Sequence, residues 1–286
     1  MKNLLLLCFV VLSITAVKAQ RIQVELLGGI SNYQGDLLPI VFTFRQAQPA
    51  FNANVKYQLS NHFYVRGGIA AGAIRADDKK SSRDDLKVRN LNFQSHISEI
   101  NAGLEYDLIS LENFPVTPYF FTGIGLFHFN PYTFDQSGQK IYLQPLSTEG
   151  QGLPEYPDRK PYFLTQVCWP LAGGIKYEPC INLQISCEFG FRKLFTDYLD
   201  DVSDTYADEA VLLAERGAKS VELSYRGDEL PGGNPNYPKG MVRGNKNEMD
   251  WYYFTGLKLT FRLGNGGICN IGRGSSKNKL GCPKAW

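Results

Sequence analysis

Residues 181–192 read "INLQISCEFGFR", and this stretch decides the fold. Large apolar side chains occupy every second position from Ile181 to Phe191, whereas polar or small residues occupy the positions between them, from Asn182 to Arg192. A period of two indicates a β-strand with one apolar face. A tilted strand of this length is also long enough to cross a bilayer.

The same alternation continues along the chain. It is clear in 51–59 and 251–263 and looser in 21–28, 63–76, 93–108, 117–129 and 165–177, which makes eight predicted strands. Short connections (60–62, 110–115 and 178–180) alternate strictly with long ones (29–50, 77–92, 130–164 and 193–250). This pattern predicts an all-β fold, an eight-stranded antiparallel transmembrane β-barrel with short periplasmic turns and long outer loops.

Alternation alone does not distinguish a membrane barrel from a soluble barrel with an apolar, ligand-binding interior. Two features favour the membrane. Aromatic residues gather near the strand ends, where an interfacial girdle would lie: Tyr57, Tyr106, Trp169, Tyr177, Trp251 and Tyr253. The polar face carries charges of both signs: Glu25, Lys56, Arg66, Glu99, Glu105, Lys176, Glu188, Arg192, Lys258 and Arg262. Because side chains just fill an eight-stranded interior, we expect these charges to pair and the barrel to be a plug rather than a pore.

The first nineteen residues, "MKNLLLLCFVVLSITAVKA", have the features of a signal peptide, with an early Lys, an apolar run and small residues before the cleavage position. We therefore divide the chain into a signal peptide (1–19), a barrel (20–263) and a tail (264–286). Loss of Lys2 and Lys18 leaves 30 − 2 = 28 basic residues against 28 acidic ones. A neutral chain without a basic block argues against a nucleic-acid partner.

The residues give little sign of catalysis. The histidines, His62, His96 and His128, form no HExxH pair, and the sequence has neither a GxSxG elbow nor a glycine-rich phosphate loop. We expect no enzymatic activity and no cofactor, although a ligand-binding barrel and an outer-membrane enzyme stay open as alternatives.

An acidic run begins the longest loop, within "EFGFRKLFTDYLDDVSDTY" (188–206). Its residues Asp197, Asp200, Asp201 and Asp204 offer the hard oxygen ligands that calcium prefers, but they lack the spacing and central glycine of a calcium loop. We expect a solvated turn or loop here. In the loop 129–162, which is rich in Tyr and Pro, we expect proline to prevent an extra strand and aromatic packing to provide order.

Four stretches resemble the PorG family of Bacteroidetes outer-membrane proteins: "SNYQGDL" (31–37), "FNPYTFDQSGQKIYLQPLSTEGQGLPEYPDRKPY" (129–162), the 188–206 stretch and "DWYYFTGLKLTF" (250–261). The resemblance spans nearly the whole chain after the signal peptide. It implies an outer-membrane barrel of the type IX secretion system, linked to gliding motility in some members, whose partner is a periplasmic ring built from a lipoprotein and a second subunit. It implies no catalytic residues.

The tail, "GNGGICNIGRGSSKNKLGCPKAW", contains no acidic residue. Its basic residues are Arg273, Lys277, Lys279 and Lys284, and its cysteines are Cys269 and Cys282. With Cys180 in a predicted turn, three cysteines would share the oxidising periplasm. One hypothesis is a frayed tail closed by a Cys269–Cys282 bridge. The other is that the tail docks on the ring lipoprotein, with one of the three cysteines bonded to that partner.

Overall fold

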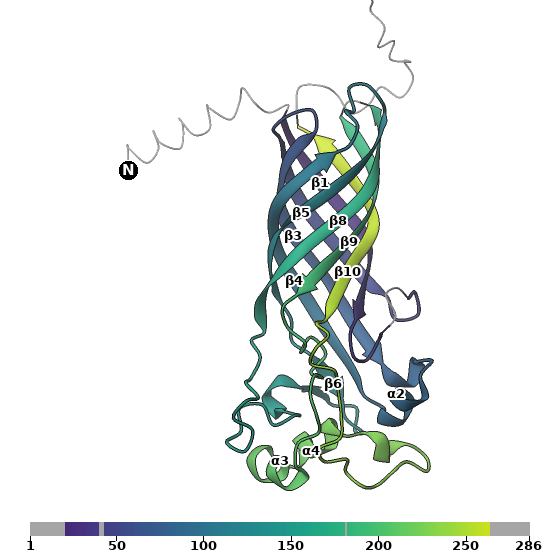
Figure 1. The fold of residues 1–286 in the computed structure, drawn as a ribbon. Helices are drawn as coiled ribbons and strands as arrows, with labels where there is room; N and C mark the ends of the chain where they lie inside the picture. The colour runs from purple at the N-terminus through teal and green to yellow at the C-terminus, as the bar shows by residue number, and fades with distance from the viewer. Residues whose placement is uncertain (1–20, 40–42, 181, 264–286) are drawn as a thin grey trace, which may run out of the picture.

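The chain forms a closed antiparallel barrel (Figure 1). The computed structural model describes residues 21–39, 43–180 and 182–263. The barrel strands are β1 (Ile22–Gln34), β2 (Gln48–Gln58), β3 (Phe63–Asp77), β4 (Asn92–Asp107), β5 (Val116–His128), β8 (Thr165–Cys180), β9 (Leu183–Leu194) and β10 (Trp251–Arg262). Each pairs with the next, and β1 closes the circle with β10, in a register that runs from Gln23 opposite Arg262 to Gln34 opposite Trp251. The predicted fold class is confirmed.

The two ends of the barrel differ as the connections do. At one end lie the short turns, and at the other the long connections form a separate mass beyond the strands, as Figure 1 shows. We call these the turn end and the loop end. The main difference from the predicted boundaries is in β1, which continues to Gln34 instead of ending at Gly28. Its second half carries Gly29, Ser31 and Asn32, and these small or polar residues make the alternation of apolar and polar positions hard to detect in the sequence.

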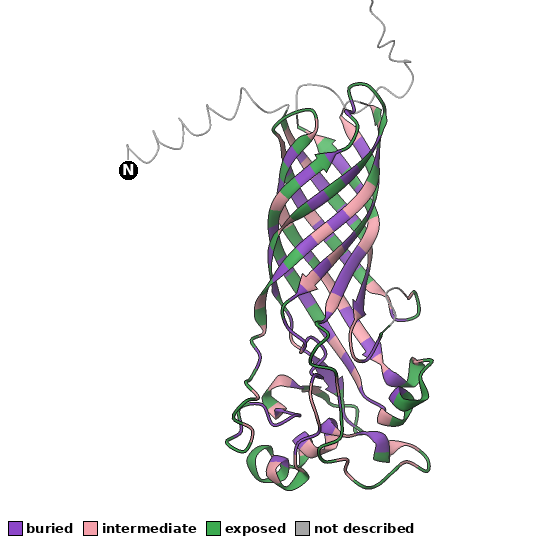
Figure 2. Cartoon of the chain, in the orientation of Figure 1, coloured by how far each residue is buried: buried purple, intermediate pink, exposed green. Residues whose placement is uncertain are grey.

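The burial pattern alternates along β5 and along the second half of β10, and purple and green bands follow one another on the barrel wall in Figure 2. The outward side chains are apolar: Ile124 and Leu257 are each 64% exposed, and Ile69 and Ile100 are each 60% exposed. The inward side chains are largely polar and charged. This is the arrangement of a membrane barrel and the reverse of a soluble ligand-binding barrel.

The predicted aromatic girdle is partly exposed. Tyr106, Trp169 and Tyr177 are between 40% and 48% exposed at their strand ends. Tyr253 is buried instead, because its ring stacks on Phe189 and its hydroxyl donates to Gln34 over 2.9 Å.

The long connections contain short elements, none of which belongs to the barrel wall. They are η2 (Asp78–Lys80), α2 (Asp84–Arg89), β6 (Tyr132–Phe134), β7 (Lys140–Tyr142), η3 (Gln144–Leu146), α3 (Glu209–Arg216), α4 (Ala218–Ser224) and η4 (Gly227–Glu229). Within the described ranges, no helix has the length and apolar character needed to span a membrane.

The expectation that proline prevents an extra strand in 129–162 is wrong. β6 and β7 form a small hairpin that joins the outer part of β4 through Gln94 opposite Tyr132. The prolines Pro131 and Pro145 fall on either side of the hairpin, so no ladder amide is lost. Its turn is held by Asp135, whose carboxylate accepts the amides of Ser137 and Gln139 over 3.0 and 2.8 Å.

Candidate functional site

The lumen of the barrel holds a connected network of charged side chains. Nine of the ten charged residues predicted for the polar face point inward and are at most 3% exposed: Glu25, Lys56, Arg66, Glu99, Glu105, Lys176, Glu188, Arg192 and Lys258. The tenth, Arg262, lies at the turn end, where its guanidinium is 3.6 Å from Glu178 and its side chain is 24% exposed.

Glu105 is the centre of this network. Its carboxylate accepts Lys56 over 3.0 Å, Arg66 over 3.0 Å and Lys176 over 2.5 Å. Lys176 reaches beyond it to Asp107. The strands β2, β3, β4 and β8 are therefore joined across the lumen by side chains as well as by their ladders.

Glu188 and Glu25 extend the network to strands β1, β9 and β10. Glu188 accepts Arg66 and Lys258, each over 2.7 Å, and Glu25 accepts Lys56 over 2.9 Å. The network thus contains four cations (Lys56, Arg66, Lys176, Lys258) and four anions (Glu25, Glu105, Asp107, Glu188), so that 4 − 4 = 0. Such neutrality is what a closed, water-poor interior requires, since an unpaired charge there is costly.

A second, smaller ion pair lies nearer the loop end. Arg192 donates to Glu99 through Nε over 2.9 Å and Nη2 over 3.3 Å, in a bidentate contact. The hydroxyl of Tyr252 and the amide of Asn101 also donate to Glu99, each over 2.7 Å. With its carboxylate fully satisfied, Glu99 forms the polar floor beneath the aromatic core.

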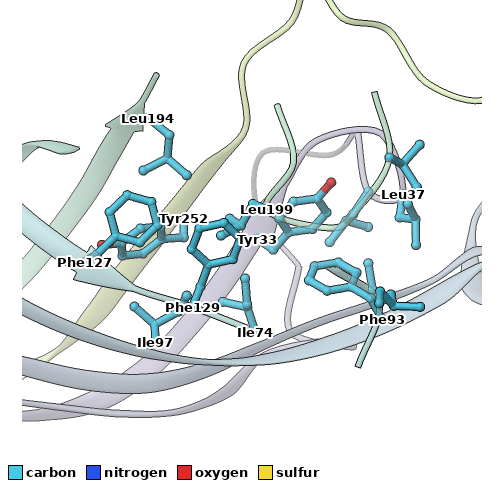
Figure 3. Packing of buried hydrophobic residues seen from close by; sticks show 14 of the residues in the cluster. Tyr33, Leu37, Ile74, Phe93, Ile97, Phe127, Phe129, Leu194, Leu199 and Tyr252 are labelled. Atoms are coloured by element: carbon cyan, nitrogen blue, oxygen red, sulfur yellow. The ribbon is translucent and has the colours of Figure 1, made fainter. Parts of the chain in front are cut away.

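Aromatic rings fill the lumen between Glu99 and the loop end. The rings form a row in space. The centroid of Phe127 lies 5.6 Å from that of Tyr252 and 5.4 Å from that of Phe129. The row continues from Phe129 to Tyr162 over 6.0 Å and from Tyr162 to Tyr198 over 5.1 Å. Figure 3 shows the first three of these rings packed together beside Ile97 and Leu194. The barrel is closed at this end by packed rings.

Two distinctive sequence stretches, 129–162 and 188–206, meet at the loop end. Together with the rest of the long loops (129–164 and 195–250) they form a compact unit that we call the cap. Asp201 accepts the hydroxyls of Thr148 over 2.5 Å and Tyr162 over 2.7 Å. Glu149 accepts the backbone amides of Ser203 and Asp204 over 2.9 and 3.0 Å. The two stretches are therefore joined by buried hydrogen bonds.

The acidic run does not form a solvated loop as expected. Asp197, Asp200 and Asp201 are at most 5% exposed, because the cap folds back on the barrel and covers them. Tyr33 donates its hydroxyl to Asp200, which ties the run to strand β1, and the same hydroxyl lies 3.2 Å from Asp250, the residue before β10. Among the described residues, no group of three or more His, Cys, Asp or Glu side chains has the arrangement of a metal site.

Asp197 is the exceptional member of the run. Considering the described part of the chain, neither of its buried carboxylate oxygens has a hydrogen-bond partner of good geometry. Burial raises the pKa of Asp197 to about 9, and the nearby carboxylate of Asp200 adds to the effect. The raised pKa favours the protonated form of Asp197 at neutral pH.

At the turn end, a cavity of about 290 Å³ opens among the strand ends. Its lining is mainly polar: Gln58, Asn61, Tyr64, Ser110, Leu111, Glu112, Glu178 and Arg262. Cys180, close by at the end of β8, is disulfide-bonded. The tail residues predicted for partner binding, Arg273, Lys277, Lys279 and Lys284 with Cys269 and Cys282, lie outside the described residues.

Sequence reasoning missed several members of the lumen networks, among them Asp107, Tyr119 and Tyr252. Asp107 pairs with Lys176, Tyr119 donates to Glu188 over 2.7 Å, and Tyr252 donates to Glu99. Period two could have found them, because each lies an even number of positions from an inward charge on its own strand or, for Tyr119, from the inward Thr117.

Comparison with known proteins gives one family. A family model described as "Domain of unknown function (DUF6089)" matches residues 2–148. No curated protein matched the chain.

Several solved structures are similar in fold. Neisserial surface protein A has 10% identity and a TM-score of 0.40, over 84% of this chain and 96% of its own. The outer membrane protein OprG from Pseudomonas aeruginosa has 8% identity and a TM-score of 0.39, over 85% and 97%. The N-terminal β-barrel domain of OprF from the same organism has 10% identity and a TM-score of 0.34, over 85% and 98%.

Proposed function

The chain belongs to the family described as a domain of unknown function, DUF6089, and we propose that this member is a non-enzymatic outer-membrane barrel of the type IX secretion system. In this role it attaches the periplasmic lipoprotein ring to the outer membrane. The barrel spans the membrane with its turn end and both termini in the periplasm and its cap outside the cell.

The observation that carries the membrane assignment is the orientation of the two faces. Apolar side chains such as Ile69, Ile124 and Leu257 project outward at 60% exposure or more, whereas Lys56, Lys176 and Lys258 are fully buried inside. An aqueous environment would favour the opposite arrangement, because each exposed apolar side chain loses its burial energy and each buried charge must be compensated. A bilayer satisfies both faces.

A structural role suits the interior better than transport does. The lumen is occupied by a neutral set of paired side chains at the turn end and by packed aromatic rings toward the loop end. Across the described residues, these side chains fill the lumen, as expected for an eight-stranded barrel. The barrel is then a rigid membrane anchor whose two ends are available for contacts.

The secretion role is supported by the resemblance of four stretches to the PorG family. Two of them, 129–162 and 188–206, supply the contacts that build the cap, such as Tyr162 to Asp201. A resemblance that includes residues folding against each other in the cap is more specific than strand alternation, which any barrel shares.

The experiment is a pull-down from detergent-solubilised outer membranes, using an affinity tag inserted in the exposed turn at Asn113. We expect the ring lipoprotein to copurify with the barrel, and unboiled samples to migrate faster than boiled ones, as folded membrane barrels do. A folded barrel that copurifies with a small molecule instead of the lipoprotein would favour the ligand-binding alternative.

Protease added to intact cells should cut the cap at exposed sites such as Lys160. Protection of the cap until the membrane is opened would invert the orientation.

A further inference from the structure

One aromatic side chain, Tyr64, borders both the turn-end cavity and the charge network of the lumen. Tyr64 is 2% exposed and lines the cavity. The ammonium groups of Lys56 and Lys176 lie 4.8 and 5.0 Å from the centroid of its ring. Both lysines are paired with Glu105. These two cations therefore neutralise a carboxylate of the lumen and not those of the cavity.

The cavity itself carries an excess of negative charge. The charged side chains of its lining are Glu112, Glu178 and Arg262, so the formal charge is 1 − 2 = −1. Arg262 lies 3.6 Å from Glu178, and the side-chain amide of Gln184 also donates to Glu178 over 3.0 Å. Glu112 is exposed and accepts the side-chain amide of Asn61 over 2.7 Å, but it has no ion-pair partner in the described part of the chain. The excess charge therefore lies on Glu112.

Neutral polar groups with free hydrogen-bonding capacity line the same cavity. The hydroxyl of Tyr64 makes no hydrogen bond within the described ranges, although the side chain is almost completely buried. Gln58 lies opposite Tyr64 in the β2–β3 ladder, and its side-chain amide is also without a hydrogen-bond partner among the residues that the structure describes. A buried polar group without a partner is unfavourable, and a bound polar ligand removes that cost.

The fold fixes the positions of the two carboxylates. The turn 108–115 joins β8 because the carbonyl of Pro115 accepts the backbone amide of Glu178 over 2.8 Å. Within the turn, the hydroxyl of Ser110 accepts the backbone amide of Glu112 over 3.3 Å. The cavity is therefore formed before any ligand binds, which limits the entropy that is lost on binding.

We propose that the turn-end cavity binds a primary ammonium group on a flexible alkyl chain, as carried by a lysine side chain of another protein or by a polyamine. An ammonium has N–H donors and no acceptor, which suits a cavity whose free groups are a carboxylate, a hydroxyl and a side-chain amide. Its charge offsets the excess negative charge of the lining. The volume of about 290 Å³ lies at the small end of ligand sites, which start at about 300 Å³, and it suits a single chain of this kind.

The geometry at Glu112 favours an ammonium over a guanidinium. Oε2 of Glu112 already accepts Asn61, so one oxygen stays open. A guanidinium binds a carboxylate best through two parallel hydrogen bonds, whereas an ammonium acts as a compact point charge. This binding property goes beyond the secretion role proposed above and requires no component of the ring.

The first test is the binding of cadaverine, a diamine whose chain reproduces the side chain of lysine. Saturation-transfer NMR titrations use the full-length barrel purified in an uncharged detergent. We expect saturable binding that is about fivefold weaker in Glu112→Gln, as for the loss of one partly exposed ion pair. Tyr64→Phe, which keeps the ring beside Lys56 and Lys176, should give an intermediate loss. The matched control Glu215→Gln removes an exposed carboxylate from the cap and should bind like the wild type.

Heat-dependent gel migration verifies that each variant is folded. Three results would overturn the proposal: no saturable binding to the wild type, equal affinities for the wild type and Glu112→Gln, or equally strong binding of 1,5-pentanediol, the uncharged analogue of cadaverine. Because the titration uses the purified barrel alone, its outcome is separate from that of the pull-down.

The second test identifies the source of the ammonium group in whole cells. A water-soluble carbodiimide joins a carboxylate to an amine that contacts it, and mass spectrometry identifies the product. We expect Glu112 to be joined to a lysine of a second protein or to a polyamine, which distinguishes the two sources, and Glu215 to carry no such adduct. A link from Glu112 only to a lysine of the same chain, or no more adduct at Glu112 than at Glu215, would refute the proposed site.

Discussion

Arg243 and Glu149 are 94 residues apart in the sequence, yet Nη1 of Arg243 lies 2.9 Å from Oε1 of Glu149, and both side chains are buried. Arg243 also donates to the backbone carbonyl of Asp201 over 2.6 Å. One guanidinium therefore holds together the 129–164 and 195–250 loops. The cap is a folded unit because of such contacts between its loops.

Arg243→Ala should unfold the cap without unfolding the barrel. The substitution leaves Glu149 buried without its cation, which costs about 3–5 kcal/mol. The measurement is the free energy of unfolding of the cap, followed by protease susceptibility in increasing urea. The control is Lys246→Ala, because Lys246 lies 3.8 Å from Asp204 on the exposed surface and such pairs contribute about 0–1 kcal/mol. Equal losses for the two variants would refute the central role of Arg243.

A charged side chain placed on the outer face should lower the free energy of unfolding most when it lies at the middle of a strand. Leu257→Arg introduces a guanidinium at the centre of β10 and should lower the free energy of unfolding in lipid by about 2–4 kcal/mol. Phe261→Arg lies on the same face near the strand end, where the cost should be about 0–1 kcal/mol. Reversible urea unfolding in vesicles measures both. A larger loss at Phe261 than at Leu257 would place the membrane elsewhere on the barrel.

Removing one charge from the lumen should destabilise the barrel more, per side chain removed, than removing an oppositely charged pair. Lys258→Met leaves four anions against three cations and should cost about 3–5 kcal/mol. Lys258→Met/Glu188→Gln restores neutrality, so the double variant should be more stable than the sum of the two single losses, with a coupling energy of about 0.5–3 kcal/mol. The same unfolding assay gives all three values. Strict additivity would show that the two side chains do not interact.

The stability of the cap should fall as the pH rises. The folded-state pKa of Asp197 is about 9, above its value in the unfolded chain, about 3.9. The folded state therefore holds the proton more tightly, and this stabilisation is fully present below pH 4 and is lost as the pH rises toward 9. Asp197→Asn mimics the protonated form and should reduce the slope between pH 5 and 9, measured by thermal unfolding of the cap. An unchanged slope would mean that Asp197 is ionised in the folded protein.

The barrel could be predicted from the sequence because its determinants are local. Alternation within each strand, as in 181–192, sets which side chains face lipid and which face the lumen, and connection length sets the topology. The inward position of charges such as Glu105 and Lys176 followed from period two alone.

The cap could not be predicted in the same way. Its order depends on contacts such as Tyr162 to Asp201 and Arg243 to Glu149, which join positions 39 and 94 residues apart. Composition made the acidic run look solvated, because no local signal shows that Tyr33 and the folded loops cover Asp200. A polar residue in a loop is exposed or buried according to partners that only the folded chain brings together.

Site-specific photo-crosslinking in whole cells tests the attachment role most directly. A photoreactive residue is placed at exposed Asn113 in the turn end and, as a matched control, at exposed Lys160 in the cap, and the crosslinked products are identified by mass spectrometry. We expect crosslinks from position 113 to the ring lipoprotein and none to it from position 160. A correctly inserted barrel that yields no lipoprotein crosslink from position 113, or yields it only from position 160, would rule out attachment through the turn end.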